Sequence, residues 1–259
     1  MSSTEQLAAS FEVVNEVLPS QGAARSLRAI AAPGREPGLR ERWVHAFAQG
    51  AAHLVVQKPR SETLRFGLVR EPEEFAAVGR MRLRVYGAKL PYLLKELSPE
   101  GMDAYDAHSF IFATWWKDRV VATVRTTRYP YETLRYVPEP ALSSWMKEGW
   151  DTDFLEWGRL LVDSTEGFNR LTPALLTYAG LYLHGLTPYR KYFGYARPHG
   201  RKSFSGFQLS QNAPSFTIPE RGEHAYQLLK GELSREVLFS VPRWLGSLAG
   251  RMLSSARAS

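Results

Sequence analysis

Apolar positions along the chain alternate between strand-like and helix-like spacing. The run LRFGLV at residues 64–69 stops at a Glu-Pro pair and predicts a strand. Residues 73–86 then carry large apolar side chains at helical spacing, with Arg80, Arg82 and Arg84 on the other face. A strand followed by a two-faced helix therefore opens the central part of the chain.

A β pattern follows. Two aromatic and β-branched runs, at residues 109–116 and 120–129, flank a short polar turn at residues 117–119 and predict a β-hairpin. The run FLEWGRLLV at residues 154–162 predicts another strand. Four further elements are expected after it: a helix at about 172–185 with Pro173 in its first turn and Gly185 at its end, a strand at 192–196, a short helix at 201–207, and one or two strands toward Val241.

This order predicts an α/β (α+β) fold in which one mixed central β-sheet is flanked by helices on both sides. Extra helices are expected in the first thirty residues and at 39–53, around a Pro- and Gly-rich linker at 32–38. We therefore expect an N-terminal helical extension at 1–63, a central domain at 64–240 and a tail at 241–259.

Composition narrows the class of protein. The chain has 259 residues, of which 44% are hydrophobic, so it can bury a core and is not mainly disordered. It has no cysteine, which excludes disulfides, thiolate zinc sites and cysteine nucleophiles. The N-terminus lacks the pattern of a signal peptide, and no apolar run reaches about 18 residues. We expect a soluble, cytoplasmic protein.

The net charge of +7 is unevenly distributed. Between Glu166 and Glu220 there is no acidic residue, although six Lys and Arg lie in that interval. The tail has three arginines, no acid and an apolar side that includes Trp244 and Leu248, as in basic amphipathic helices that touch anionic membranes. The alternatives are a solvated basic face and, for the tail, packing against its own domain. An acidic protein partner fits the charge, whereas nucleic acid is not expected because no nucleic-acid-binding motif accompanies it.

Charged residues at the edges of apolar strands are the candidate chemistry. Arg125 lies in the second hairpin strand, and Glu156 and Arg159 lie in the next strand. Ions there cost several kcal/mol of desolvation unless they are paired, and Asp103 and Asp106, just before the hairpin, are the obvious partners. One arginine could instead bind an amino-acid carboxylate.

Residues three apart in a strand point to opposite faces. Glu156 and Arg159 can share a face only if the strand contains a bulge, and Gly158 indicates one near Trp157 and Gly158.

These residues resemble a known family. Arg84 with Val85 and Tyr86 comes first; it is followed by Asp103-x-x-Asp106, by Arg125-Thr-Thr-Arg and by Glu156-x-x-Arg159. The set is similar to that of the acyl-homoserine-lactone (autoinducer) synthases and of the related N-acyl amino acid synthases, over about residues 64–240. The resemblance implies a GNAT-like acyltransferase fold. Autoinducer synthases have a Glu where this chain has Gly101, and a Trp that is missing between Tyr86 and Asp103, so the amino-acid branch is favoured.

The resemblance also implies the reaction. An amine attacks a thioester directly, backbone N–H groups at a strand bulge stabilise the oxyanion, and the donor is acyl carrier protein or acyl-CoA, with no permanently bound cofactor and no metal. The site residues it implies are Glu156, Arg125, Arg159, Asp103 and Asp106 for catalysis, and Leu161, Val162, Arg170, Leu171, Thr172 and Arg201 for the donor.

Glu156 is the expected base, with a pKa raised by burial and opposed by an arginine. The alternatives are that Glu156 only completes an ion-pair network and that His108 is the base.

Tyr178 and Tyr182 share a helix face and line either the core or an acyl channel. We expect an N-acyltransferase that acylates an amino acid or related amine, at the inner face of the membrane if the tail docks there. The alternatives are autoinducer synthesis and a non-catalytic module that binds acyl carrier protein or membrane.

Overall fold

The computed structural model describes residues 34–56, 64–163, 165, 167–197, 213–222 and 224–233. The helices expected in the first thirty residues and at 201–207, Arg201, and the amphipathic tail lie outside the described residues. Within them, the elements in chain order are α3 (Leu39–Val55), β1 (Leu64–Leu68), α4 (Pro72–Lys89), η3 (Pro91–Glu96), η4 (Asp106–His108), β2 (Ser109–Trp116), β3 (Arg119–Thr127), η5 (Glu132–Arg135), α5 (Glu139–Met146), β4 (Phe154–Val162), α6 (Leu171–Leu186), β5 (Lys191–Ala196), β6 (Ser215–Thr217), η8 (Pro219–Arg221) and β7 (Ala225–Glu232).

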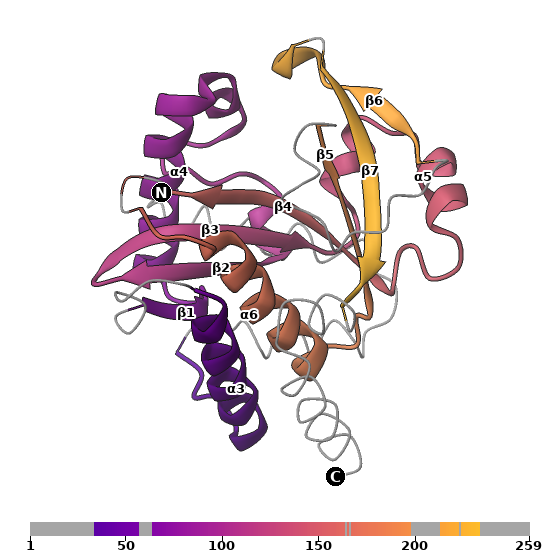
Figure 1. Cartoon of the computed structure of the whole chain (residues 1–259). Helices are drawn as coiled ribbons and strands as arrows, with labels where there is room; N and C mark the ends of the chain where they lie inside the picture. The colour runs from indigo at the N-terminus through magenta and orange to yellow at the C-terminus, as the bar shows by residue number, and fades with distance from the viewer. Residues whose placement is uncertain are drawn as a thin grey trace.

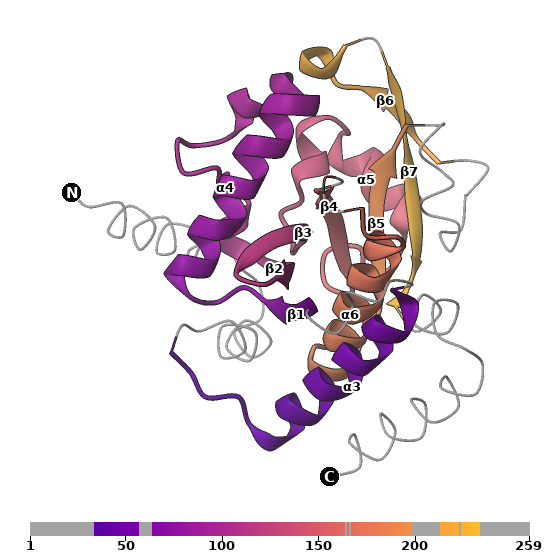
Figure 2. The ribbon, with the colours of Figure 1, turned by 60° about the vertical axis from the view of Figure 1, so that its left-hand side comes forward.

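In the described part of the chain, seven strands form one mixed sheet, in the order β1-β2-β3-β4-β5-β7-β6 (Figure 1). Neighbouring strands are antiparallel except β4 and β5, which are parallel and are connected through α6. Helices α3 and α6 cover one face of the sheet and α4 covers the other (Figure 2). The predicted fold class, a mixed sheet flanked on both sides by helices, is confirmed.

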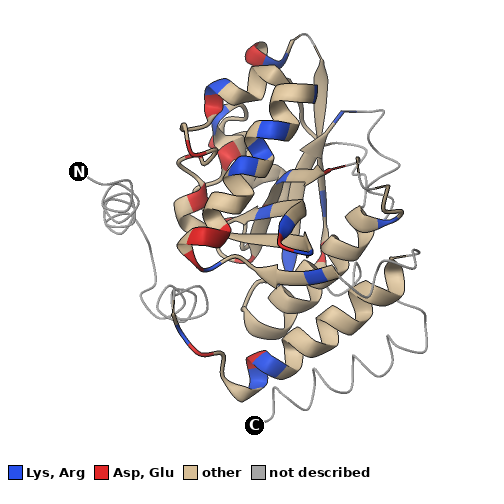
Figure 3. Cartoon of the chain, turned by 90° about the vertical axis from the view of Figure 1, so that its left-hand side faces the viewer, with Lys and Arg blue, Asp and Glu red and all other residues tan. Residues whose placement is uncertain are grey.

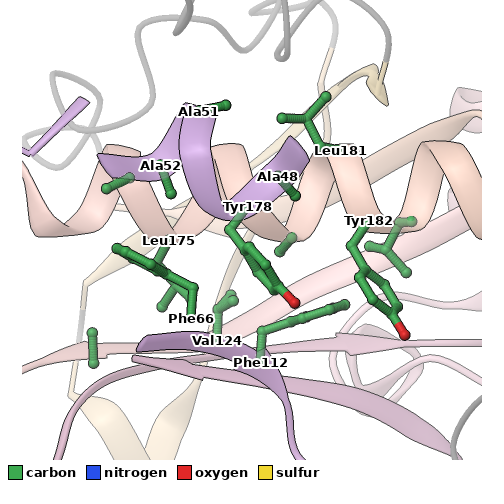
Figure 4. Close-up of a cluster of buried hydrophobic side chains, with 14 of the residues drawn as sticks. Ala48, Ala51, Ala52, Phe66, Phe112, Val124, Leu175, Tyr178, Leu181 and Tyr182 are labelled. Atoms are coloured by element: carbon green, nitrogen blue, oxygen red, sulfur yellow. The ribbon is translucent and has the colours of Figure 1, made fainter. Parts of the chain in front are cut away.

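The larger core lies between α6, α3 and the sheet, and Figure 4 shows its aromatic centre. Phe66 and Phe112 rise from the sheet toward Tyr178 and Tyr182, which lie one turn apart on α6. Both tyrosines therefore pack in the core. Their hydroxyls are also satisfied, because Tyr178 hydrogen-bonds His45 at 2.7 Å and Tyr182 donates to Glu41 at 2.5 Å.

Two expectations about elements need correction. The helix α5 was not predicted, because residues 139–146 lie inside a connection rich in Pro, Gly and charge. Arg82 does not share the outer face of α4 with Arg80: its side chain is fully buried, whereas Arg80 is exposed. Spacing explains this, since Arg82 lies four residues after Val78 and four before Tyr86, both of which are buried.

The loop before β2 crosses α4 at very short range. A side chain at Gly79 would clash with the backbone carbonyl oxygen of Glu100, and Gly101 opposite it has a φ of +81°. Only residues without a Cβ allow this approach. The contact fixes the loop that carries Asp103 and Asp106 directly above Arg82.

Gly79→Ala is therefore expected to destabilise the fold by about 3 kcal/mol or more, since overpacking against backbone cannot be relieved by a rotamer change. Gly87→Ala is the matched control in the same helix, because its Cβ would meet nothing within 4 Å. That change should stabilise the protein by up to about 1 kcal/mol through helix propensity. Urea denaturation measures both, and equal effects of the two substitutions would contradict the close approach.

Candidate active site

The parallel strands β4 and β5 pair over only part of their length. Pairing ends at Trp157 and Gly194, although β4 continues to Val162 and β5 to Ala196. Beyond that point β4 pairs only with β3, and β5 only with β7. Gly194 is needed where the strands part, because a Cβ there would lie 2.8 Å from the carbonyl oxygen of Trp157. The sheet thus opens into a fork.

A cavity of about 210 Å³ occupies the fork. Its apolar wall comes from both sides of the sheet: Leu90 and Leu93 follow α4, whereas Leu176 belongs to α6. Its polar wall is formed by three charged side chains, Glu132, Arg159 and Arg221. The cavity therefore passes between the strands and joins an apolar region to a charged one.

The predicted bulge is present, slightly further along β4 than expected. Arg125 pairs with Gly158 and Thr123 pairs with Leu161, so one residue of β3 faces two residues of β4. The two residues opposite Val124 are Arg159 and Leu160, and Arg159 has a φ of +49°. This turn of the backbone brings Arg159 to the face that also carries Glu156.

Buried ion pairs cover that face. Arg82 binds both oxygens of Asp106, at 2.6 and 3.1 Å. Arg125 binds Asp103 at 2.5 Å and also pairs with Glu132. The predicted pairing of Arg125 with the Asp103-x-x-Asp106 segment is confirmed, and its distance to Asp106 is 3.5 Å.

Arg159 lies at the junction of this network. Its guanidinium contacts Asp103 at 2.9 Å, Glu96 at 2.7 Å and Glu132 at 3.3 Å. Arg221 completes the network from the far end of the chain, binding Glu96 at 3.0 Å and Glu132 at 3.4 Å. The ion pairs of the cavity wall therefore join segments before β2, after β3 and before β7.

Four guanidinium groups and four carboxylates make up this network: Arg82, Arg125, Arg159 and Arg221 with Glu96, Asp103, Asp106 and Glu132. Their formal charges cancel. Burial raises the pKa of Asp103, but Arg125, Arg159 and Arg82 outweigh burial and lower it to about 2. Burial also raises the pKa of Glu96, and Arg159 and Arg221 again leave it below its usual value.

Glu156 is a fifth carboxylate, directly behind this wall. Its side chain is 2% exposed and accepts hydrogen bonds from the backbone N–H of Glu132 at 2.6 Å and from the N–H and hydroxyl of Thr133 at 3.1 and 2.5 Å. Burial and the neighbouring Glu132 charge raise its pKa to about 7, against the opposing effects of Thr133 and Arg125. Glu156 thus holds the first turn of η5, and it does not itself line the cavity.

The predicted donor-binding residues are spread over two places. Leu161 lines the cavity, whereas the half-buried Val162 does not. The exposed Arg170 precedes α6 with a φ of +60°, followed by Leu171 and Thr172 in the first turn. The N–H groups of that first turn have no partner within the helix, as phosphate-binding helix starts require.

Two sequence-derived candidates lie away from the cavity wall. His108 is buried and hydrogen-bonds the carbonyl oxygen of Pro130 at 3.0 Å, and burial lowers its pKa. Arg84 lies on the outer face of α4, where it pairs with Asp163 at 2.9 Å. The arginine of α4 that joins the network is Arg82, and helical spacing from Tyr86 could have found it.

Glu96, Glu132 and Arg221 were missed from the sequence. They lie in short 3-10 helices, where neither strand nor helix periodicity marks a buried position. Arg221 and Glu96 are 125 residues apart, so no local pattern connects them.

Comparison with solved structures identifies proteins that have a similar fold. The AHL synthase LasI matches with a TM-score of 0.53 and 16% identity, over 69% of this chain and 93% of that one. The CoA-dependent acyl-homoserine lactone synthase MesI matches with a TM-score of 0.53 and 16% identity, over 70% and 95%. No protein-family model and no curated protein sequence matches the chain. At this identity the similarity concerns the fold, and the expected GNAT-like fold, shared with AHL synthases, is confirmed.

Proposed function

We propose that the chain is an N-acyltransferase that moves a fatty acyl group from a thioester donor to the amine of a small acceptor. The observation that carries this proposal is the cavity in the sheet fork, which joins an apolar wall to a wall of paired carboxylates and arginines. An acyl chain suits the first wall, and an acceptor that carries both an amine and a carboxylate suits the second.

The reaction needs no covalent enzyme intermediate. The acceptor nitrogen, after losing a proton, attacks the thioester carbonyl carbon and forms a C–N bond and a tetrahedral oxyanion. The oxyanion collapses, the C–S bond breaks, and the thiolate leaves and takes up a proton. Backbone N–H groups near the bulge at Arg159 and Leu160 are the proposed oxyanion donors, because the bulge faces the cavity.

Glu132 is the proposed contact for the acceptor amine. It is the carboxylate among the cavity-lining residues, and Arg159 and Arg221 hold it in place. Glu156, one layer behind, is the proposed proton acceptor through an intervening water. Its pKa of about 7 suits proton transfer near neutral pH.

The proposed donor is acyl carrier protein or acyl-CoA. Arg170 and the first turn of α6 offer a positive, N–H-rich place for the phosphate of a phosphopantetheine arm. The acid-free interval between Glu166 and Glu220 suits an acidic carrier protein. MesI is a CoA-dependent synthase, which supports acyl-CoA as the donor.

The acceptor is proposed in two forms. The sequence favours an amino acid or related amine, because residues typical of autoinducer synthases are absent at Gly101 and between Tyr86 and Asp103. LasI and MesI are both acyl-homoserine-lactone synthases, and their similarity in fold supports the autoinducer alternative more strongly.

Incubation of the full chain with acyl-CoA or acyl carrier protein tests the function. Each donor is combined with an amino-acid mixture or with S-adenosylmethionine, and mass spectrometry identifies an acyl amide or an acyl lactone. Thiol release can be followed with a thiol reagent, because the chain contributes no cysteine. Carrier-protein binding with no thiol release under any combination would favour the non-catalytic module and overturn the proposal.

Kinetic measurements can separate the roles proposed for Glu132 and Glu156. Glu132→Gln is expected to raise the acceptor KM at least tenfold, because an amide binds an ammonium less strongly than a carboxylate does. Glu156→Gln is expected to lower kcat about 100-fold and to abolish the rise of kcat/KM through about pH 7. If Glu156→Gln keeps both the rate and the pH profile, Glu156 only holds η5.

The raised pKa of Glu156 also predicts a pH dependence of stability. Its ordinary value is 4.5 and its folded value is about 7, so between these pH values the folded state binds more protons than the unfolded state. Stability from this group therefore falls as pH rises, by on the order of 2 kcal/mol. Urea denaturation of wild type and Glu156→Gln at pH 5 and pH 8 should show wild type losing stability relative to the variant. A difference that stays constant or grows with pH would refute the shift.

A further inference from the structure

Helix α3 exposes its largest apolar side chains. Leu39 is 68% exposed, Trp43 64% and Leu54 56%, and these are the large hydrophobic residues that the described part of the chain leaves exposed. All three belong to one helix. Spacings of four, eleven and fifteen residues place them on one stripe, because each spacing is close to a whole number of helical turns.

The opposite face of α3 packs through small side chains. Val44, Ala48, Ala51, Ala52 and Val55 are buried, and all of them except Val44 belong to the core that α3 shares with α6 and the sheet. Most surface helices bury their bulky residues and expose their polar ones. In α3, Phe47 is half-buried against the core, whereas Leu39, Trp43 and Leu54 are exposed. Packing among the described residues therefore does not account for these three side chains.

The charge around the stripe is positive. Arg42 is exposed on α3, as is Arg40 at its start. The acidic residue of the helix, Glu41, is buried and is paired with Arg35 and Arg70. In Figure 3, α3 is coloured for charge only near its N-terminal end, and the rest of its ribbon is uncharged.

We propose that α3 is a docking helix that lies flat on an anionic lipid surface. Trp43 suits the headgroup level, where an indole buries its ring and hydrogen-bonds through its N–H. Leu39 and Leu54 enter the boundary of the acyl chains on either side of it. Arg42 meets lipid phosphate while its methylene stem covers apolar surface.

Charge and position favour lipid over a protein occupant. An acidic carrier protein suits the arginines but leaves the Leu and Trp stripe without a reason. Helix α3 also packs along α6, which contributes Leu176 to the cavity. If the proposed acyltransferase function holds, a surface beside α6 places an apolar product next to the membrane, although docking itself does not depend on that function.

Within the described residues, no helix is long and apolar enough to cross a bilayer. A helix lying in the interface is the form of contact that the exposed stripe of α3 supports.

Co-sedimentation of the full chain with vesicles tests the proposal without donor or acceptor, so its result is independent of catalysis. The vesicles are phosphatidylcholine alone or phosphatidylcholine with phosphatidylglycerol. Wild type is expected to bind the anionic vesicles, and a triple variant, Leu39→Ser, Trp43→Ser and Leu54→Ser, is expected to bind at least tenfold more weakly. These positions are exposed, so circular dichroism should show an unchanged fold.

A matched pair of charge variants tests whether α3 is the surface that contacts the anionic lipid. Arg42→Ser lies on α3, and Arg80→Ser makes the same change on the exposed face of α4, across the sheet. Only Arg42→Ser should weaken binding to anionic vesicles.

Three outcomes would overturn the proposal. In one, wild type fails to bind anionic vesicles. In another, the triple variant binds them as well as wild type while removal of residues 241–259 abolishes binding, which would assign the contact to the tail. In the third, light scattering shows that the triple variant converts a dimer to a monomer, which would make the stripe an interface between copies.

Discussion

Asp103 is the ion on which the site depends. Its carboxylate lies between Arg125 of β3 and Arg159 of β4 and binds both. Either guanidinium alone would cost several kcal/mol to bury, and removing one partner of such a pair typically costs about 3–5 kcal/mol. Asp103 belongs to the loop whose Gly101 packs closely against Gly79 of α4. The position of α4 therefore determines whether the buried arginines of the sheet are neutralised.

The bulge in β4 and the ion pairs of Arg159 stabilise each other. The bulge turns Arg159 toward the carboxylates, and its left-handed φ is unfavourable for a residue with a side chain. Three carboxylates compensate for that conformation by holding the guanidinium in place. The same bulge lies in the part of β4 that has left β5, so the irregular strand, the cavity and the charged wall occupy one place.

Much of the fold follows from the sequence. The strand Phe154–Val162 and the hairpin could be predicted because their apolar runs are bounded by polar turns. Pairing of Arg125 with Asp103 could be predicted because a buried ion needs an opposite charge nearby. The placement of Arg82 on the outer face of α4 was wrong, because of the three arginines Arg80, Arg82 and Arg84 only Arg82 faces inward. Glu132 and Arg221 could not be found, because their burial depends on where 3-10 turns meet in space. Whether Glu156 and the donor-binding residues act as expected stays a prediction.

The contact between Glu96 and Arg221 bears on how the protein reaches its native state. It joins residues 125 positions apart, whereas the β2–β3 hairpin joins immediate neighbours in the chain. Closing so long a loop costs more entropy, and contacts of this range form late in folding. The packing of α3 on α6 depends on contacts of similar range, such as those of His45 with Tyr178 and of Glu41 with Tyr182, which span 133 and 141 residues. The charged wall and the α3–α6 core therefore both form only when the two ends of the folded region meet, and the local hairpin can form before either.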